Sequence, residues 1–368
     1  MVARPTSTAK FCAAVCLFGL GCGDASIASS EDDVKVNTGS ELAYRQYRAN
    51  VEFAAGYAPR CAAPALGEDG VPRPRVLVTG FGRFLENPKN ATGMLVSELV
   101  PELEYPLTEA PPSGQIDPPE PQLAVATGTL ELSGSGTVDV CALVLPVFWD
   151  LAAVLVAREI AAFSPDLVIM NGIAGSAQPL WLELGAVNHA AALTDGSGVL
   201  VAEAGPIVAH ASSDAYARPN LLSWDAVRTG AEAAIGEHAG TVEAGAAFGD
   251  LVTGVRLAGY PRASNTYLCN NTTYAVGYLM DHADEAVRLL EPTHGKEGEP
   301  MGLEVALPPG FEATPRVFVH WPSSLDGAHL VSAASVLAHV IDAQLVALAE
   351  GPLPVRGDTV TPDLPGDG

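Results

Sequence analysis

Cys269 is the residue of this sequence that is best placed to act as a nucleophile. It lies where an extended segment gives way to a helical pattern, which we expect over Asn271 to Ala283. A thiol at a helix start is close to unpaired N–H groups and to the positive end of the helix dipole, which favour the thiolate. Position alone is equally compatible with a buried structural thiol.

Two other residues supply the groups that such a thiolate needs. His320 ends an apolar strand pattern at Val317 to Val319, and Trp321-Pro322 follows at once. Glu183 lies in an otherwise apolar run, where a carboxylate is costly without a partner. A histidine beside the thiolate and a carboxylate beside the histidine would form a hydrolytic triad. A structural histidine and a water-exposed edge carboxylate are the alternatives.

Strand patterns alternate with helical ones along the chain, which predicts how these residues are positioned. Continuous apolar strands in strand–helix–strand units indicate a mostly parallel sheet with helices on both faces. In such folds the chemistry gathers at the carboxyl ends of the strands. The predicted strands are Arg75 to Gly80, Val138 to Pro146, Asp166 to Met170 and Val317 to Val319, and the predicted helices are Thr92 to Val100, Leu151 to Phe163 and Ser332 to Glu350.

Composition argues against nucleic acid as a partner. The 368 residues carry a formal charge of −24, and no cluster of Lys and Arg is present to bind nucleic acid phosphates. The acidic balance is that of a solvated surface. We expect one α/β domain over residues 46–351, a flexible acidic tether over 23–45 and a disordered tail over 352–368.

The N-terminal residues 1–22 resemble an export signal. Arg4 and Lys10 precede a short apolar run from Phe11 to Leu20, which is too short to span a bilayer. Gly21-Cys22 then resembles a lipoprotein cleavage site, at which Cys22 would be lipidated. A cleaved secretory signal and an uncleaved anchor are the alternatives. We therefore expect an exported protein, held at a membrane only through a lipid on Cys22 or secreted.

The remaining cysteines predict a scaffold that does not rely on disulfides. Cys61, Cys141 and Cys269 are left beyond the leader, and this odd number leaves at least one thiol free. Cys61 and Cys141 could pair, or Cys141 could be an ordinary buried strand residue. No His, Asp or Glu stands at metal-ligand spacing from them, so we expect no metal site.

Several segments together resemble the pyroglutamyl peptidase I family of cysteine peptidases, which remove N-terminal pyroglutamate. The resemblance spans roughly residues 74–345 and keeps the order Glu, Cys, His. The matching segments are Thr79 to Phe84 with Asn90, Leu145 to Val147, Pro165 to Met170, Gly172, Glu183, Ser264-Asn265, Tyr267 to Asn270 and Val319 to Pro322.

This resemblance implies a fold, an activity and a set of site residues. The fold would be a three-layer α/β/α sandwich with a mostly parallel twisted sheet, like the phosphorylase/hydrolase folds. The triad would be Cys269, His320 and Glu183, the substrate a peptide or small amide, and no cofactor is implied. The oligomeric state stays open. The implied substrate-binding residues are Phe81, Phe84, Asn90, Ile173, Tyr267 and Leu268; plain core packing is the alternative for the aromatic ones.

Departures from the family pattern leave the substrate open. Ile173 stands where the family usually has Gln, and Ala177 where it has Arg. Insertions near residues 194–250 and 291–312 enlarge the body. A cysteine amidase with a changed acyl group and a surface binding protein on this scaffold are therefore the rival functions. The Gly80-Phe81-Gly82 stretch is not a nucleotide-binding loop, because Leu85 stands where the third glycine belongs.

Overall fold

A computed structural model describes residues 35–62, 70, 72–262, 266–293, 302–351 and 353. The chain divides into two units, Met1–Glu31 and Asp32–Gly368, and all described residues belong to the second. The predicted export signal, Cys22 and the tail beyond 353 lie outside the described residues, as does the Ser264-Asn265 part of the nucleophile motif.

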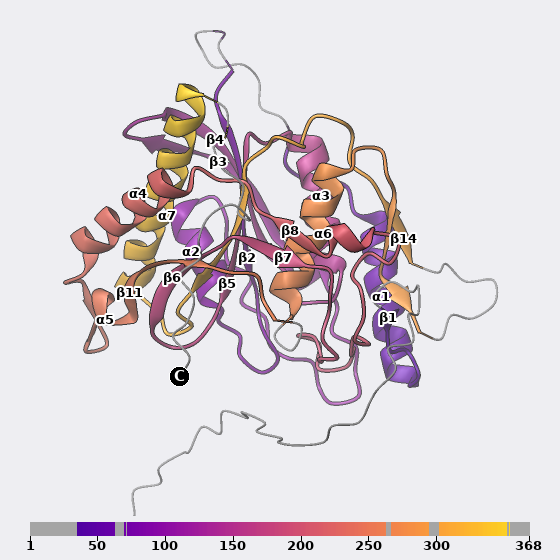
Figure 1. Cartoon of the computed structure of the whole chain (residues 1–368). Coiled ribbons are helices and arrows are strands. Elements are labelled where there is room, and N and C mark those ends of the chain that lie inside the picture. The colour runs from indigo at the N-terminus through magenta and orange to yellow at the C-terminus, as the bar shows by residue number, and fades with distance from the viewer. Residues whose placement is uncertain are drawn as a thin grey trace, which may run out of the picture. The chain divides into compact units, whose positions relative to one another are not determined.

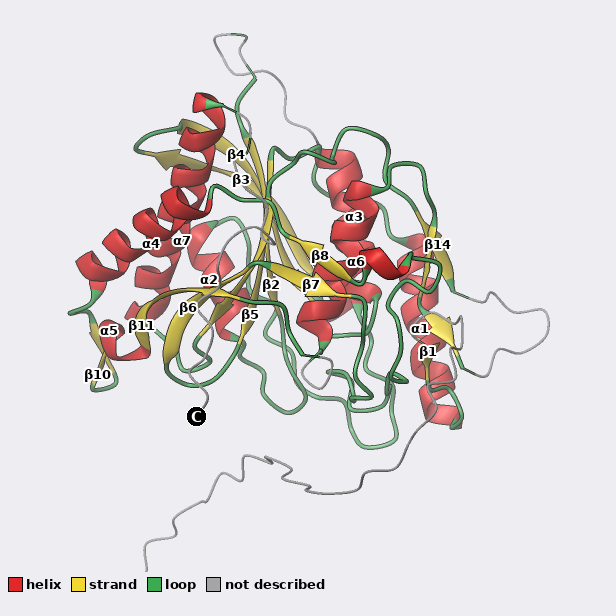
Figure 2. Ribbon diagram, viewed as in Figure 1, coloured by secondary structure: helices red, strands yellow, loops and turns green. Residues whose placement is uncertain are grey.

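A seven-stranded sheet forms the centre of the described part of the chain (Figures 1 and 2). The strand order is β11-β6-β15-β5-β2-β4-β3, and all neighbours are parallel except β6–β15 and β4–β3. The predicted mostly parallel sheet is confirmed. The strands are β2 Arg75–Phe81, β3 Ala124–Leu132, β4 Gly136–Leu145, β5 Leu167–Ile173, β6 Gln178–Glu183, β11 Val252–Ala258 and β15 Arg316–Trp321.

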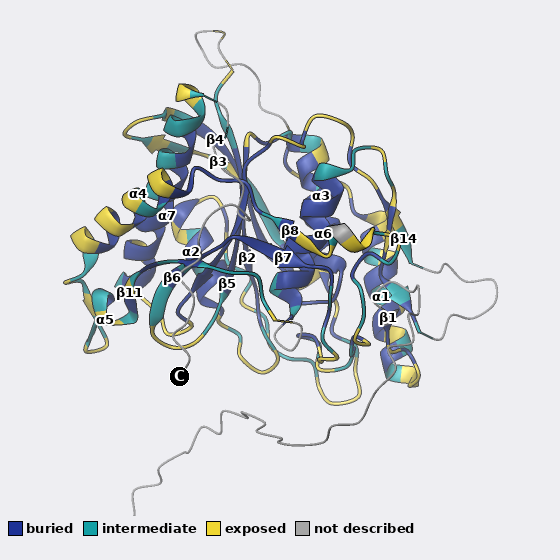
Figure 3. Ribbon diagram, in the orientation of Figure 1, coloured by how far each residue is buried: buried dark blue, intermediate teal, exposed yellow. Residues whose placement is uncertain are grey.

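Helices cover both faces of this sheet and make three layers. One apolar cluster packs α1, α3 and α6 on one face, and a second packs α2, α4 and α7 on the other. The central strands are buried on both sides (Figure 3), which explains their uninterrupted apolar sequences. The helices are α1 Glu41–Gly56, α2 Ala91–Leu99, α3 Leu151–Phe163, α4 Trp224–His238, α5 Phe248–Leu251, α6 Leu268–Asp281 and α7 Ala328–Glu350.

Short strands and turns complete the described chain, several of them in the regions predicted as insertions. Residues 194–250 contribute β8, α4, β9 and β10, and residues 291–312 contribute β13 and β14. These short elements are β1 Lys35–Val36, β7 Gly185–Val187, β8 Ala217–Pro219, β9 Val242–Glu243, β10 Ala246–Ala247, β12 Val287–Leu289, β13 Glu291–Pro292, β14 Leu303–Val305 and the 3-10 turns Glu120–Gln122 and Ser213–Ala215.

The prediction of a flexible tether over residues 23–45 is wrong for its last part. Lys35 and Val36 pair with β13, and α1 begins at Glu41 with the Ser40 side chain accepting a hydrogen bond from the Ala43 N–H. Polar sequence suggested a tether here. The cap and the buried face of α1, which packs into the cluster with α3 and α6, give this segment a fixed place instead.

The expectation of a scaffold without disulfides is also wrong. Cys61, which follows α1, is bonded to Cys141 in β4, and Cys269 is the free cysteine among the described residues. The buried Glu159 carboxylate accepts hydrogen bonds from the Cys61 N–H, the Arg60 N–H and the Tyr57 hydroxyl. A crosslink across a sequence separation of 80 stabilises the folded chain by about 4.5 kcal/mol in the chain-entropy description. It fastens the N-terminal helix to the sheet.

α7 is the one described helix whose length and composition would allow it to cross a membrane. In this fold it packs against α2 and α4, and 56% of its most apolar window is buried within the protein. Such burial is typical of the core helix of a globular domain.

α7 also anchors the hairpin between β3 and β4. The Asp342 carboxylate accepts hydrogen bonds of 2.8–2.9 Å from the N–H groups of Gly134 and Ser135 and from the hydroxyls of Ser133 and Ser135. Partial burial would raise the pKa of Asp342, but these donors outweigh it and lower the pKa below its usual value. The ionised form of Asp342 therefore stabilises the fold.

We predict that Asp342→Asn lowers the free energy of unfolding at pH 7 by about 1–2 kcal/mol, because hydrogen bonds to a charged acceptor are weakened. A depressed pKa contributes stability above the unfolded value, and this contribution is lost as the pH falls through the folded value. Urea unfolding at pH 7 and pH 3 should show the difference from wild type shrinking at pH 3. Glu237→Gln, on the exposed surface of α4, controls for loss of a charge. A difference that does not change with pH would contradict this role.

Candidate active site

Three chain segments that are far apart in sequence bring Cys269, Glu183 and His320 together. His320 lies near the carboxyl end of β15, and Glu183 is the last residue of β6, which runs antiparallel beside it. Cys269 lies in the first turn of α6, which packs on the same sheet. His320 pairs with Trp181 across these two strands, so Glu183, two residues further along the same face of β6, lies diagonally opposite His320.

The imidazole of His320 is in direct contact with the Glu183 carboxylate. Nδ1 of His320 lies 2.9 Å from Oε1 of Glu183, and both side chains are about nine-tenths buried. The ring N–H does not point straight at this oxygen, so Nδ1 lacks a well-aligned hydrogen bond. The contact is therefore an ion pair at hydrogen-bond distance. Catalytic hydrogen bonds often align only when substrate is bound.

The Cys269 thiol is the second partner of the same imidazole. Burial acts to lower the pKa of His320, but the charges of Glu183 and Cys269 and their polar contacts with the ring outweigh it and raise the pKa to about 10. Its two partners therefore favour the protonated form of the imidazole. With Nδ1 facing Glu183, the other ring nitrogen is left for the thiol, as a thiolate–imidazolium pair requires.

Aromatic side chains frame the His320 ring. The Phe318 ring lies 4.9 Å from it between centroids, and the Trp181 ring meets it edge-on at 6.0 Å. The guanidinium group of Arg256 in β11 lies over the Trp181 ring, 5.6 Å from its centre. Sequence reasoning did not find Trp181 as a site residue. The only indication in the sequence was the alternation of side chains along a strand, which puts residues 181 and 183 on the same face of β6.

The nucleophile helix begins three residues earlier than predicted. α6 starts at Leu268, so Cys269 is its second residue rather than a residue before it. The first N–H groups of a helix have no partner within it, and a capping side chain often accepts from one of them. Tyr267 stands at the capping position here, and its side chain makes no capping bond. Among the described residues, the Cys269 N–H has no acceptor.

Asn270 fixes this helix start to β7. Its side-chain amide donates to the carbonyls of Val187 and His189, and its Oδ1 accepts from the Val187 N–H. These hydrogen bonds tie the residue next to Cys269 to the backbone at two positions, Val187 and His189.

Gly172 makes room for the nucleophile. It lies beside His320 in the register of β5 and β15, and a Cβ atom at this position would come within 2.9 Å of the Cys269 Sγ atom. The same Cβ would come within 2.7 Å of the Phe318 ring. Glycine is therefore required here by close approach rather than by its backbone angles.

Two of the predicted substrate-binding residues form an aromatic wall next to Cys269. The rings of Phe84 and Tyr267 meet edge-on, with centroids 6.2 Å apart, and Trp149 meets Tyr267 at 5.4 Å. The Tyr267 hydroxyl donates to the Thr194 carbonyl at 2.5 Å. Trp149 was not among the predicted residues; it gave no signal beyond its size.

The other predicted substrate-binding residues serve the core or a helix cap. Phe81 and Leu268 are buried in the cluster below α3 and α6. The Asn90 side chain caps α2 by accepting from the Thr92 N–H and hydroxyl. Ile173 packs with the cluster on the opposite face of the sheet from Cys269.

Among the described residues, one group of side chains of the types that bind metals lies close together in space, namely Cys61, Cys141 and Glu159. Both sulfurs are used in the disulfide, and the Glu159 carboxylate already accepts three hydrogen bonds. In this state the group has no thiolate to offer a metal ion.

Comparison with solved structures returns pyroglutamyl peptidases. Pyroglutamyl peptidase I from Bacillus amyloliquefaciens is 15% identical with a TM-score of 0.45, covering 76% of this chain and 100% of its own. Pyrrolidone carboxyl peptidase from Thermococcus litoralis is 15% identical, with a TM-score of 0.45, and covers 77% and 99%. The enzyme from Pyrococcus furiosus is 17% identical, with a TM-score of 0.44, and covers 75% and 99%.

No model of a protein family matches the chain, and no curated protein does. At these identities and TM-scores the chain is similar to these peptidases, and its membership of their family stays a prediction from the sequence motifs.

We predict that Glu183→Gln lowers the pKa of His320 markedly from about 10, because it removes the carboxylate that stabilises the imidazolium. The histidine Cε1–H signal, followed by NMR against pH and assigned with His320→Asn, measures this. Glu304→Gln, at the exposed residue of β14, is the matched control. An unchanged His320 titration in Glu183→Gln would show that the two side chains do not pair in solution.

Proposed function

We propose that this chain is a cysteine hydrolase that removes N-terminal pyroglutamate from peptides. The observation that carries the proposal is the contact of one buried imidazole with both a carboxylate and the free thiol, Glu183 and Cys269. The motifs around these residues support the pyroglutamyl specificity.

In the acylation step the Cys269 thiolate attacks the carbonyl carbon of the pyroglutamyl residue. The oxyanion that forms is within reach of the Cys269 N–H, which has no acceptor among the described residues and lies at the positive end of α6. The His320 imidazolium then gives its proton to the departing amine, the carbon–nitrogen bond breaks, and a thioester remains.

Deacylation requires His320 as a base. Once the sulfur is acylated, its negative charge no longer holds the proton on His320, so the pKa of the imidazole falls and it can take a proton from water. Hydroxide attack on the thioester releases pyroglutamate and the thiolate. Glu183 keeps the ring oriented throughout, which is the role of the carboxylate in such triads.

The aromatic wall suits a small flat acyl group but leaves its identity open to test. Phe84 and Tyr267 supply the aromatic wall. Ile173 packs on the other face, and Ala177 is an exposed residue that cannot bind a lactam through a polar side chain. These two departures favour a related cysteine amidase with another acyl group as the second candidate.

We predict that the full chain hydrolyses pyroglutamyl-aminomethylcoumarin and that Cys269→Ala loses about ten-thousand-fold in kcat/KM, because the nucleophile is removed. A panel of other N-acyl coumarin amides runs beside it. Cleavage of another acyl amide but not of the pyroglutamyl one would favour the amidase. Failure to cleave any of them, in a chain with a reactive Cys269, would favour a binding protein.

We also propose that the protein is exported and anchored through a lipid on Cys22. The leader-like sequence of residues 1–22 carries this proposal. The Cys61–Cys141 disulfide supports it, because disulfides persist mainly in oxidising compartments.

If Cys22 is lipidated, expression of the full chain in bacteria with a labelled fatty acid should give a labelled band in the membrane fraction. Cys22→Ser should lose the label, while Cys12→Ser should keep it. Equal labelling of the two variants would contradict anchoring through Cys22.

A further inference from the structure

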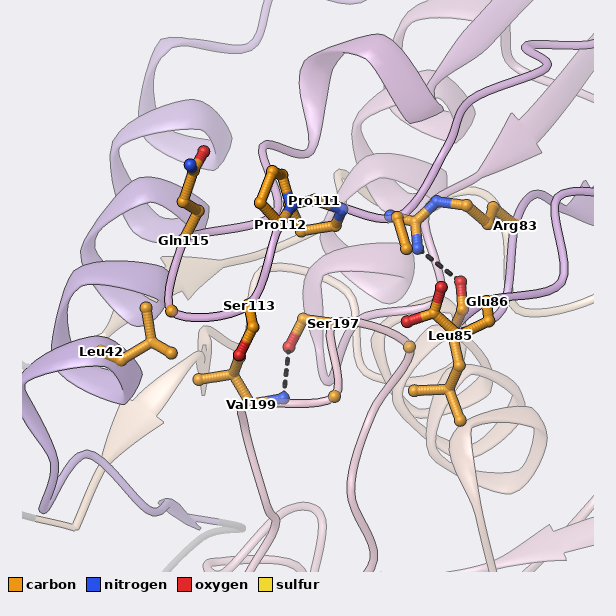
Figure 4. A pocket seen from close by; sticks show the side chains of 14 residues that line it. Leu42, Arg83, Leu85, Glu86, Pro111, Pro112, Ser113, Gln115, Ser197 and Val199 are labelled. Atoms are coloured by element: carbon orange, nitrogen blue, oxygen red, sulfur yellow. Dashed lines mark hydrogen bonds between the residues drawn. The ribbon is translucent and has the colours of Figure 1, made fainter.

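A cavity of about 300 Å³ lies beside the aromatic wall of the candidate active site, and the mechanism above does not use it (Figure 4). The segment after β2 forms one side of it, a proline-rich loop the second, and a turn after Asp195 the third. The lining residues are Leu42, Arg83, Leu85, Glu86, the segment from Ala110 to Gln115 and the turn from Gly196 to Val199.

The cavity shares a wall with the candidate active site. Leu85 and Glu86 directly follow Phe84, whose ring packs on Tyr267, two residues before Cys269. On the other side, Tyr267 bonds to Thr194, and the Leu85 N–H donates to the Gly196 carbonyl. A peptide that enters the site therefore has this cavity next to the wall that receives its first residue.

The one unbalanced charge in the lining is negative. The Arg83 guanidinium is buried and paired with the buried Asp117 carboxylate, and it also donates to the Leu85 carbonyl at 2.7 Å. Glu86 is exposed and makes no ion pair or hydrogen bond with any described residue. Figure 4 shows its carboxylate turned toward the middle of the lining residues.

The walls are held in place before any ligand arrives. The Ser197 hydroxyl donates to the buried Asp195 at 2.5 Å and accepts from the Val199 and Leu200 N–H groups. Phe84 and Asn87 exchange two backbone hydrogen bonds next to Leu85. A preformed cavity loses little conformational freedom on binding.

We propose that this cavity binds a cationic side chain of the peptide downstream of pyroglutamate, with Glu86 as its counter-charge. This rests on the proposed function and names the substrate class: peptides with Lys or Arg within the residues that follow. Three extended residues reach about 10 Å, and the first three downstream positions are therefore the ones to test.

The test compares peptides that differ in one charge only. Each peptide is an amide of pyroglutamate followed by three residues. One of these three residues is Arg, or its neutral analogue citrulline, and the other two are alanine. At one position at least, kcat/KM should favour Arg roughly fivefold, as expected for a partly exposed ion pair, and 0.5 M NaCl should reduce the preference.

Two variants distinguish an effect of the Glu86 charge from an effect of the net negative charge of the protein. Glu86→Gln should bring the Arg-to-citrulline ratio to about one, whereas Glu109→Gln, an exposed residue on the same loop as Ala110, should keep it. Equal rates for Arg and citrulline at all three positions in wild type, or a preference that survives Glu86→Gln, would overturn the proposal.

A binding measurement keeps the outcome separate from that of the proposed function. Calorimetry with the Cys269→Ala chain gives the Kd of the same peptides without turnover. Suppose that wild type cleaves none of these peptides, that Cys269→Ala binds the Arg peptide more tightly than the citrulline peptide, and that adding Glu86→Gln removes this difference. The proposed binding of a cationic side chain is then supported, and the proposed peptidase activity is contradicted. Equal Kd values for Arg and citrulline peptides overturn the cavity.

Discussion

The contact between His320 and Glu183 is the interaction on which the rest of the site depends. Two charged side chains that are about nine-tenths buried stabilise a fold only if each has the other within reach, because an unpaired charge in the interior costs several kcal/mol. The antiparallel placement of β6 beside β15 creates that reach. Once the pair exists, the imidazole keeps its proton, and a thiol brought beside it from α6 gains a cation. The position of the sulfur then depends on one glycine in β5, which leaves it space.

The sheet and the nucleophile helix are supported by different kinds of contact. The sheet is built from apolar strands buried on both faces, and it holds Glu183 and His320 through backbone pairing. The helix start is held by polar bonds instead, from Asn270 to β7 and from Asn271 to Asp150 at the start of α3.

Segments outside the candidate triad form a cavity and attach the N-terminal helix to the domain. α1, the proline-rich loop and the turn near Gly196 line a cavity beside Phe84 and Tyr267. The disulfide and the buried Glu159 fasten α1 in place, so the N-terminal segment is part of the body that surrounds the site. The candidate triad and this cavity thus lie on separate parts of the fold, the first at the strand ends and the start of α6 and the second among the surrounding loops.

The sequence by itself determined the layered α/β fold, because uninterrupted apolar strands need helices on both faces, and it nominated the three residues that meet. α3 was predicted to the residue. The tertiary structure alone decided what depends on contacts between distant segments: the pairing of Cys61 with Cys141, the folding of residues 35–45 against the core, and the neighbours Trp181 and Gly172. Local patterns record which faces are apolar. They do not record which buried groups from distant strands are opposite one another, and that placement decides which side chains can exchange a proton.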